Sequence, residues 1–425
     1  MINSILAFIK QHKTVFILIG LAIGIGLFSY LSAGRIGSEL DYVKDGKNGP
    51  DVHGDHGDKE KEGSEVPMKL EHYMEQPRAN LKLFQEPVKV KGIHVSGWVA
   101  GTKGKFNKLL KLVNETELNA MVIDVKEDAG KVTYKSEVPW TQEANSIVNM
   151  VGDMTQLMDT LKENNIYPIA RIVCFKDPIL GEKYPELALK KKDGSLWRDN
   201  KNKTWLNAYN PKAWDLLIEL SKEAARLGFR DIQFDYVRFP TDGKVNLIDY
   251  GEVEKTKAEA IAEFLAYAKK ELEPMGVDVT ADIFGIMPVV PGDAEGIGQD
   301  WEMVSEHIDY VCPMVYPSHY ANVAQNGVGQ KINGVLYKYP DLDPYGVVYN
   351  TLVLAKERID NSNANAKIRP WLQSFTASYL GKGNYQVYGG PQIRAQIQAT
   401  YDAGLEEWLL WDANNNYTEA GLLKE

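Results

Sequence analysis

From Pro87 to the C-terminus, the sequence alternates between short apolar runs typical of β-strands and longer amphipathic runs typical of helices. Eight stretches are predicted as strands: Gly92–Ala100, Ala120–Asp128, Tyr167–Phe175, Asp231–Phe239, Val277–Gly285, Ile308–Tyr316, Ile368–Phe375 and Glu406–Ala413. The clearest helix between them begins at Pro211 and ends before Gly228, both common helix boundary residues. Eight strand–helix units in one domain predict an α/β fold of the (β/α)8 TIM-barrel type.

An open, doubly wound parallel sheet is the alternative fold. Such sheets more often carry a glycine-rich phosphate-binding loop after the first strand. The segment "GTKGK", which begins at Gly101, does not match that fingerprint. A long insert, Lys176–Tyr209, follows the third predicted strand. In a barrel this insert lies on the catalytic face.

The chain divides into three parts by composition. Residues 1–35 contain the apolar run Thr14–Ala33, which is long enough to span a bilayer and follows Lys10 and Lys13. Residues 36–86 are predicted to form a disordered polar linker, and residues 87–425 form the barrel domain. We therefore expect a cell-membrane protein whose transmembrane anchor leaves the barrel outside the cytoplasm. Secretion after cleavage of a signal peptide is the alternative.

Charge and cysteine content exclude several function classes. The formal net charge of −10 argues against a nucleic-acid partner. Two cysteines, Cys174 and Cys312, are too few for a disulfide framework or a structural zinc site. His53 and His56 lie in the linker, which lacks a scaffold to hold a metal. We expect neither a metal nor a cofactor.

Side-chain alternation predicts which residues enter the barrel. The face of each strand that packs on helices must be apolar, so polar residues of the opposite parity point inward. This rule selects ten residues: Asp124, Lys126, Arg171, Gln233, Asp235, Thr280, Asp282, Tyr316, Gln373 and Asp412. On the eighth strand it also directs Trp408 inward. A ring of acids and bases at one end of a barrel is typical of a site for a polar substrate, although a buried ion network, such as Asp124 with Arg171, could also explain part of it.

Asp235 and Asp282 are the candidate catalytic residues. They lie near the ends of neighbouring strands, which are about 4.8 Å apart. Two carboxylates flanking a bond are the minimum set for glycoside hydrolysis, and a separation of about 5–5.5 Å favours retention of configuration. Because Arg238 is close in sequence and Arg171 is also near, we expect Asp235 to be the ionised partner. Asp282, which precedes Ile283 and Phe284, is then the acid.

Further polar and aromatic residues near the strand ends are candidates for substrate binding. Flat aromatic faces can stack on sugar rings, while polar groups satisfy hydroxyls; ordinary packing is the other explanation for the aromatic residues. The candidate set is Asp124, Lys126, Glu127, Arg171, Arg238, Tyr316, Gln373, Trp411, Asp412 and Trp98.

Several motifs carry a family resemblance. "GIHVSGWVAG", "VIDVKEDAGKVTY", "IQFDYVRFPTDG", "ADIFG", "PMVYPSHY" and "WLLWDANNNY" resemble the putative glycosyl hydrolase domain family of exported or membrane-anchored bacterial proteins, over about Val90 to Tyr417. The resemblance implies a barrel of the glycoside hydrolase superfamily. "GFRDIQFDYVRF" is more loosely similar to the fourth-strand motif of α-amylases, whose nucleophile would correspond to Asp235. The amylase pattern has a glutamate where this chain has Asp282, and an aspartate where it has Gln373, which argues against amylase-type activity.

The sequence leaves three functions open. The first is an extracytoplasmic glycoside hydrolase acting on a cell-wall or exported polysaccharide, with a carbohydrate substrate and the cytoplasmic membrane as partners. The second is a glycan-binding or envelope-scaffolding barrel without catalysis. The third is a metal-dependent hydrolase or deacetylase, for which His94, His307 and His319 lack ligand spacing.

Overall fold

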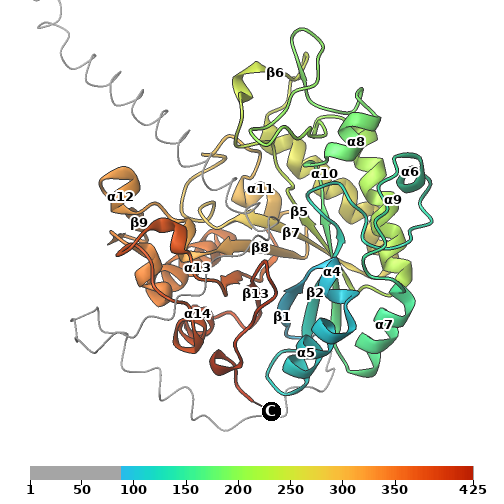
Figure 1. Ribbon diagram of the computed structural model, residues 1–425. Coiled ribbons are helices and arrows are strands. Elements are labelled where there is room, and N and C mark those ends of the chain that lie inside the picture. The colour runs from blue at the N-terminus through green and yellow to red at the C-terminus, as the bar shows by residue number, and fades with distance from the viewer. Residues whose placement is uncertain (1–87, 425) are drawn as a thin grey trace, which may run out of the picture.

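The protein, described here by a computed structural model over residues 88–424, is built around a closed barrel of parallel strands (Figure 1). The barrel strands are β1 (Lys91–Val95), β2 (Ala120–Lys126), β3 (Tyr167–Val173), β5 (Asp231–Asp235), β7 (Asp278–Phe284), β8 (Tyr310–Val315), β12 (Trp371–Gln373) and β13 (Trp408–Trp411). Each pairs in parallel with the next, and β13 pairs with β1 to close the ring. The two-residue strand β11 (Lys367–Ile368) adds to β8 just before β12. The predicted barrel fold is confirmed.

Helices surround the barrel and follow the amphipathic runs of the sequence. The main ones are α5 (Lys103–Asn114), α7 (Met154–Glu163), α9 (Pro211–Leu227), α10 (Lys257–Leu272), α11 (Trp301–Ser305), α13 (Pro344–Asp360) and α14 (Gly390–Asp402). The boundaries of α9 have a clear cause. The Asn210 side chain caps its N-terminus, and Gly228 ends it with a φ of 107°, which a side chain would disfavour.

The first barrel strand is shorter than predicted. It ends at Val95, and residues Gly97–Ala100 form the short helix α4 instead. The chain is drawn away from the sheet at Ser96, because its backbone N–H donates to Asn415 Oδ1 at 3.1 Å. Gly97 then packs closely: an added Cβ would lie 2.7 Å from the Thr133 side chain.

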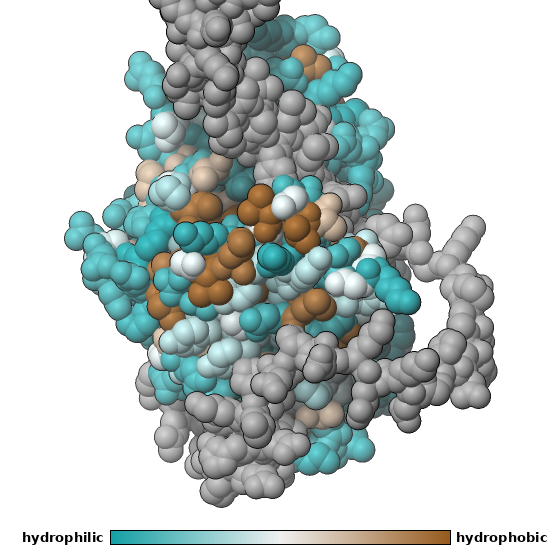
Figure 2. All heavy atoms as spheres, turned by 90° about the vertical axis from the view of Figure 1, so that its left-hand side faces the viewer, coloured by the Kyte–Doolittle hydropathy of each residue, from teal (hydrophilic) through white to brown (hydrophobic). Residues whose placement is uncertain are grey.

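Short elements decorate the ends of the barrel. The long insert contains α8 (Pro178–Lys183) and β4 (Lys190–Lys191), and β4 pairs antiparallel with β6 (Ile248–Asp249). The remaining short elements are α6 (Pro139–Glu143), α12 (Val323–Asn326) and the hairpin β9 (Gln330–Ile332) and β10 (Val335–Tyr337). Figure 2 shows apolar side chains gathered on the face that carries this hairpin, where Val335 and Leu336 are exposed.

A buried ionic network closes the barrel at the N-terminal ends of its strands. Arg369 donates to Asp231 Oδ2 at 2.6 Å and to Glu407 Oε2 at 2.9 Å, and Thr280 donates to Asp231 Oδ1 at 2.8 Å. Thr280, which the sequence predicted to point inward, therefore belongs to this structural network. Two acids share one guanidinium, and burial raises the pKa of Asp231 to about 7.

Two predictions concern N-terminal residues that the structure does not describe. The apolar run Thr14–Ala33 and the linker 36–86 both lie outside residues 88–424. Within residues 88–424, no helix combines the length and the apolar character that crossing a bilayer requires. The expected anchor thus stays a prediction. Cys174 and Cys312 are both buried and free.

Candidate active site

A small cavity opens among the C-terminal ends of the barrel strands. Its lining residues are Arg171, Asp235, Tyr236, Asp282, Met314, Tyr316, Trp371 and Trp411. Its volume of about 20 Å³ is comparable to the space of one water molecule. The cavity thus brings together the two candidate catalytic carboxylates, one guanidinium and a wall of aromatic rings.

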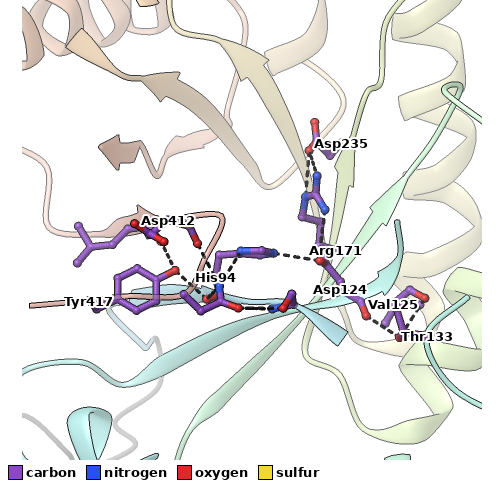
Figure 3. A network of polar contacts seen from close by, with 11 residues as sticks. His94, Asp124, Val125, Thr133, Arg171, Asp235, Asp412 and Tyr417 are labelled. Carbon is purple, nitrogen blue, oxygen red and sulfur yellow. Dashed lines mark hydrogen bonds and ion pairs between the residues drawn. The ribbon is translucent and has the colours of Figure 1, made fainter. Parts of the chain in front are cut away.

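Arg171 on β3 holds the carboxylate of Asp235 from one side. Its Nε and Nη2 atoms donate to Asp235 Oδ2 at 2.9 and 2.5 Å, while Nη1 donates to Asp124 Oδ1 at 2.6 Å (Figure 3). All three side chains are buried. The register explains the meeting, because Asp124 lies opposite Arg171 and Asp235 ends the next strand. The predicted contact between Asp124 and Arg171 is present, and the same arginine also carries Asp235.

His94 on β1 extends this network on the far side of Asp124. Its Nε2 lies 3.1 Å from Asp124 Oδ2, and its Nδ1 lies 3.2 Å from Asn415 Nδ2 (Figure 3). Burial alone would raise the pKa of Asp124, but His94 and Arg171 together lower it to about 2. Trp411 packs flat on His94, with ring centroids 4.2 Å apart. The side chains of His94, Asp124, Asn415 and Trp411 thus form a continuous set of contacts that connects β1 to Arg171.

Asp282 on β7 occupies a different environment. Trp371 Nε1 donates to Asp282 Oδ1 at 2.7 Å. Burial raises the pKa of Asp282 well above its ordinary value, and the negative charge of Asp235 raises it further. Because Gln233 pairs with Thr280, the register sets Asp235 and Asp282 at the same height on adjacent strands. The site thus offers a carboxyl that keeps its proton beside one that is bound to a cation.

The backbone is strained directly after Asp235. Tyr236 has a φ of 49°, an uncommon value for a residue with an aromatic side chain. In this conformation the Tyr236 N–H donates to Asp235 Oδ1 at 2.6 Å, so both oxygens of Asp235 have donors. Such strain persists only where the surroundings fix it, and it is concentrated at functional sites.

The structure brings five predicted site residues to the cavity wall: Asp235, Asp282, Arg171, Tyr316 and Trp411. Asp124 supports them from behind through Arg171. Lys126 does not join them, because a bulge after Asp124 shifts the register and places Lys126 opposite Ile172. Ile172 belongs to the outward, apolar parity, so the prediction that Lys126 points into the mouth is wrong. Its Nζ donates to the Val173 carbonyl at 2.7 Å and lies 2.8 Å from Asp177 Oδ2.

The other predicted binding residues lie outside the cavity lining. Gln373 is fully buried: it donates to the Asp341 carboxylate and accepts from the Ser318 N–H, both at 3.0 Å. Trp98 is 57% exposed on α4. Glu127 is buried in the turn after β2. The guanidinium of Arg238 lies over the rings of Trp205, Tyr236 and Phe284. The Asp412 carboxylate accepts from the N–H groups of Asn414 and Asn416.

The eighth strand points the opposite way from its predicted parity. Trp411 pairs with Gln373 and lines the cavity, so the odd residues of β13 face inward. Trp408, which was expected inside, donates from Nε1 to the Tyr401 hydroxyl on α14 at 3.1 Å. Parity could not decide here, because "WLLW" is apolar on both faces.

Sequence reasoning missed His94, Trp371 and Asn415 as site residues. His94 lies between Ile93 and Val95 on β1, so the alternation rule applied to this strand would have directed it inward. Trp371 has the same inward parity as Gln373, but it was not chosen as a binding residue. No local signal marks Asn415, since its role depends on contact across the closed barrel. Within residues 88–424, no group of three or more His, Cys, Asp or Glu side chains forms a metal-binding cluster.

A closed (β/α)8 barrel with carboxylates at its C-terminal mouth is the architecture of TIM-barrel glycoside hydrolases. The family described as "putative glycosyl hydrolase domain" matches residues 92–417, and the chain belongs to this family.

A solved structure with a TM-score above 0.5 has this fold, and two others are similar to parts of the chain. The PgaB (BpsB) glycoside hydrolase domain from Bordetella bronchiseptica is 10% identical with a TM-score of 0.54, covering 76% of this chain and 94% of its own. A hypothetical protein from Ruminiclostridium thermocellum is 43% identical with a TM-score of 0.42, covering 45% of this chain and 96% of its own. The Bacillus megaterium spore cortex-lytic enzyme SleL is 14% identical with a TM-score of 0.46, covering 79% and 73%. A search of curated proteins gave no match.

Proposed function

We propose that this barrel hydrolyses glycosidic bonds with Asp282 as the general acid and Asp235 as its ionised partner. The observation that carries the proposal is the contrast between the two carboxylates. Arg171 donates two hydrogen bonds to Asp235, whereas Asp282 receives its hydrogen bond from a neutral indole and has a raised pKa. One charged and one protonated carboxylate are what this reaction requires.

Each carboxylate has a defined part in the reaction. Asp282 gives its proton to the glycosidic oxygen as the bond to the anomeric carbon breaks. Asp235 attacks that carbon, and water later releases the sugar while Asp282 takes a proton back. The positions of Asp235 and Asp282 at the same height on adjacent strands favour the short spacing of this retaining route over an inverting one.

The aromatic wall supports a carbohydrate substrate. Tyr236, Tyr316, Trp371 and Trp411 line the cavity, and flat rings of this kind pack against the apolar faces of sugars. We propose a cell-wall or exported polysaccharide as substrate, reached from outside the cytoplasmic membrane. The apolar run Thr14–Ala33 after two lysines supports this location, as an anchor or as a cleaved signal.

The test is release of reducing ends from a panel of envelope polysaccharides. Asp235→Asn and Asp282→Asn should each lower kcat/KM by about 10³-fold or more. Asp278→Asn is a matched control, because this carboxylate begins β7 at the opposite end of the barrel from Asp282. The anomeric configuration of the first product, read by NMR, distinguishes retention from inversion. Equal activity in the two mouth variants and the wild type would refute the site assignment.

A glycan-binding barrel without catalysis is the second candidate. It is favoured by the close pairing of Asp235 with Arg171 and by a cavity of only about 20 Å³. This function predicts saturable binding of a polysaccharide without release of reducing ends, and binding that survives both asparagine substitutions.

A further inference from the structure

A second cavity adjoins the candidate active site. Its lining is Phe284, Gly285, Ile286, Met314, Tyr316, His319 and Tyr320. Met314 and Tyr316 line both cavities, so the two share a wall. Phe284 pairs with Met314 and has the same inward parity as Asp282, which places this cavity directly beyond Asp282 along β7. A substituent next to a bond held at Asp282 would point toward it.

The wall of this cavity is almost wholly apolar. The Tyr320 hydroxyl is already used, because it donates to the Gly285 carbonyl at 2.8 Å and lies 3.0 Å from Thr351 Oγ1. Gly285 allows close packing: an added Cβ would lie 2.3 Å from the Met314 carbonyl oxygen. The volume of about 20 Å³ has room for one group the size of a water molecule, such as a methyl group, and not for a further sugar ring.

His319 supplies the polar atom of this wall. It is half-buried at the end of the 3₁₀ turn η3 (Pro317–His319), and its Nε2 atom is buried without a hydrogen-bond partner among residues 88–424. Its Nδ1 lies 2.9 Å from Ser318 Oγ, which accepts from the Tyr379 hydroxyl at 3.2 Å. The Ser318 proton is therefore available to Nδ1, which leaves the proton of a neutral His319 on Nε2. Burial lowers the pKa of His319 to about 4, so the ring is neutral near pH 7.

We propose that this second cavity is a subsite for an acyl group on the sugar, such as an acetyl group. The methyl group packs against Phe284, Ile286 and Met314, and the carbonyl oxygen accepts from His319 Nε2. A buried hydrogen-bond donor without a partner is costly. The carbonyl oxygen of an acyl group accepts from this donor, whereas an unacylated amino group or a hydrogen atom at the same position would leave it unpaired. This assignment rests on the proposed glycoside hydrolase function and narrows its substrate class to acylated glycans.

The test compares matched oligosaccharides that differ only in acylation. Hexosamine oligomers are used in N-acetylated form, in de-N-acetylated form, and in a form that carries only O-acetyl groups, which distinguishes amide from ester. Binding to the full-length Asp235→Asn variant is measured by calorimetry, so the result does not depend on turnover. At least one acetylated form should bind about tenfold more tightly than the unacetylated oligomer, the effect of one buried hydrogen bond.

Two substitutions at His319 connect this preference to the cavity. His319→Phe keeps a ring but removes the donor, and should reduce the preference to about twofold or less. His319→Gln keeps an N–H near the position of Nε2 and should retain most of the preference. Equal binding of all forms, no binding of any form, or an unchanged preference in His319→Phe would overturn the subsite. Preferential binding by wild-type protein that releases no reducing ends would instead refute the catalytic proposal alone.

Discussion

Replacement of Arg171 by methionine tests the charge arrangement of the site directly. The wild-type guanidinium makes three hydrogen bonds, two to Asp235 and one to Asp124, and all three side chains are buried. Removing one partner of a buried ion pair costs about 3–5 kcal/mol. Here two carboxylates lose their cation, so we expect Arg171→Met to lower the free energy of unfolding at pH 7 by at least that amount.

The loss should depend on pH with a definite sign. In the wild type, the pKa of Asp124 is about 2, below its unfolded value, so its stabilisation is present above pH 4 and is lost as the pH falls toward 2. Without Arg171, the burial that raises the pKa of Asp124 is less strongly opposed, so this carboxyl binds protons more readily than in the unfolded chain. Stability of the variant should then fall as pH rises from 4 to 7, by up to about 1.4 kcal/mol per pH unit.

Urea unfolding at pH 4.5, 6 and 7.5, followed by tryptophan fluorescence, measures both effects. Arg198→Met is the matched control, because Arg198 pairs with Glu182 at the surface and its loss should cost less than about 1 kcal/mol. Arg171→Lys keeps the charge but not the forked geometry, and should lie between methionine and wild type. A methionine variant no less stable than the Arg198 control, or a loss that is the same at all three pH values, would refute the reasoning.

Two further substitutions test the proposed acid, Asp282, and the buried ionic network around Asp231. Trp371→Phe removes the indole donor to Asp282 Oδ1, which raises the pKa of Asp282 further, so the basic limb of the kcat/KM profile should move to higher pH; an unmoved limb contradicts the assigned acid. Asp231→Asn removes a carboxyl whose pKa is raised to about 7 by burial, against the opposing positive charge of Arg369. Wild-type stability should fall as pH rises from 4 to 7, and urea titrations should show this slope reduced by up to about 1.4 kcal/mol per pH unit in the variant; parallel slopes contradict it.

The fold could be predicted because its signals are local. Each barrel strand is a short apolar run, and each crossover helix carries its own boundary residues, such as Pro211 and Gly228. Alternation within a strand also placed Arg171, Asp235 and Asp282 correctly, because each of those strands is polar on one face only. Where a strand is apolar on both faces, as at Trp408–Trp411, the same rule could not decide which residues point inward.

The wrong predictions concern residues whose direction or partner is set by the geometry between strands and not by the alternation of side chains within one strand. A bulge after Asp124 reversed the direction of Lys126, and no feature of "IDVKED" announces it. Arg238 was given more weight than Arg171 as a partner of Asp235 because it is three residues away, but Arg171, which lies 64 residues earlier in the chain, donates the hydrogen bonds to Asp235. The contact between His94 and Asn415 spans 321 residues and exists only because β13 closes the barrel onto β1.

The division of roles between the two catalytic candidates follows from the charges at the mouth. Asp124, Asp235 and Asp282 place three carboxyl groups around a single guanidinium, and Arg171 directs all three of its hydrogen bonds to the first two. Ionisation of Asp282 would add a third negative charge in a buried space, so the proton stays there. The proposed acid is thus the carboxyl that receives no hydrogen bond from the arginine. The partners of the arginine depend on the register of β2, β3 and β5. The sequence could therefore predict the pair of carboxylates, but it gave weaker support for deciding which of the two is the acid.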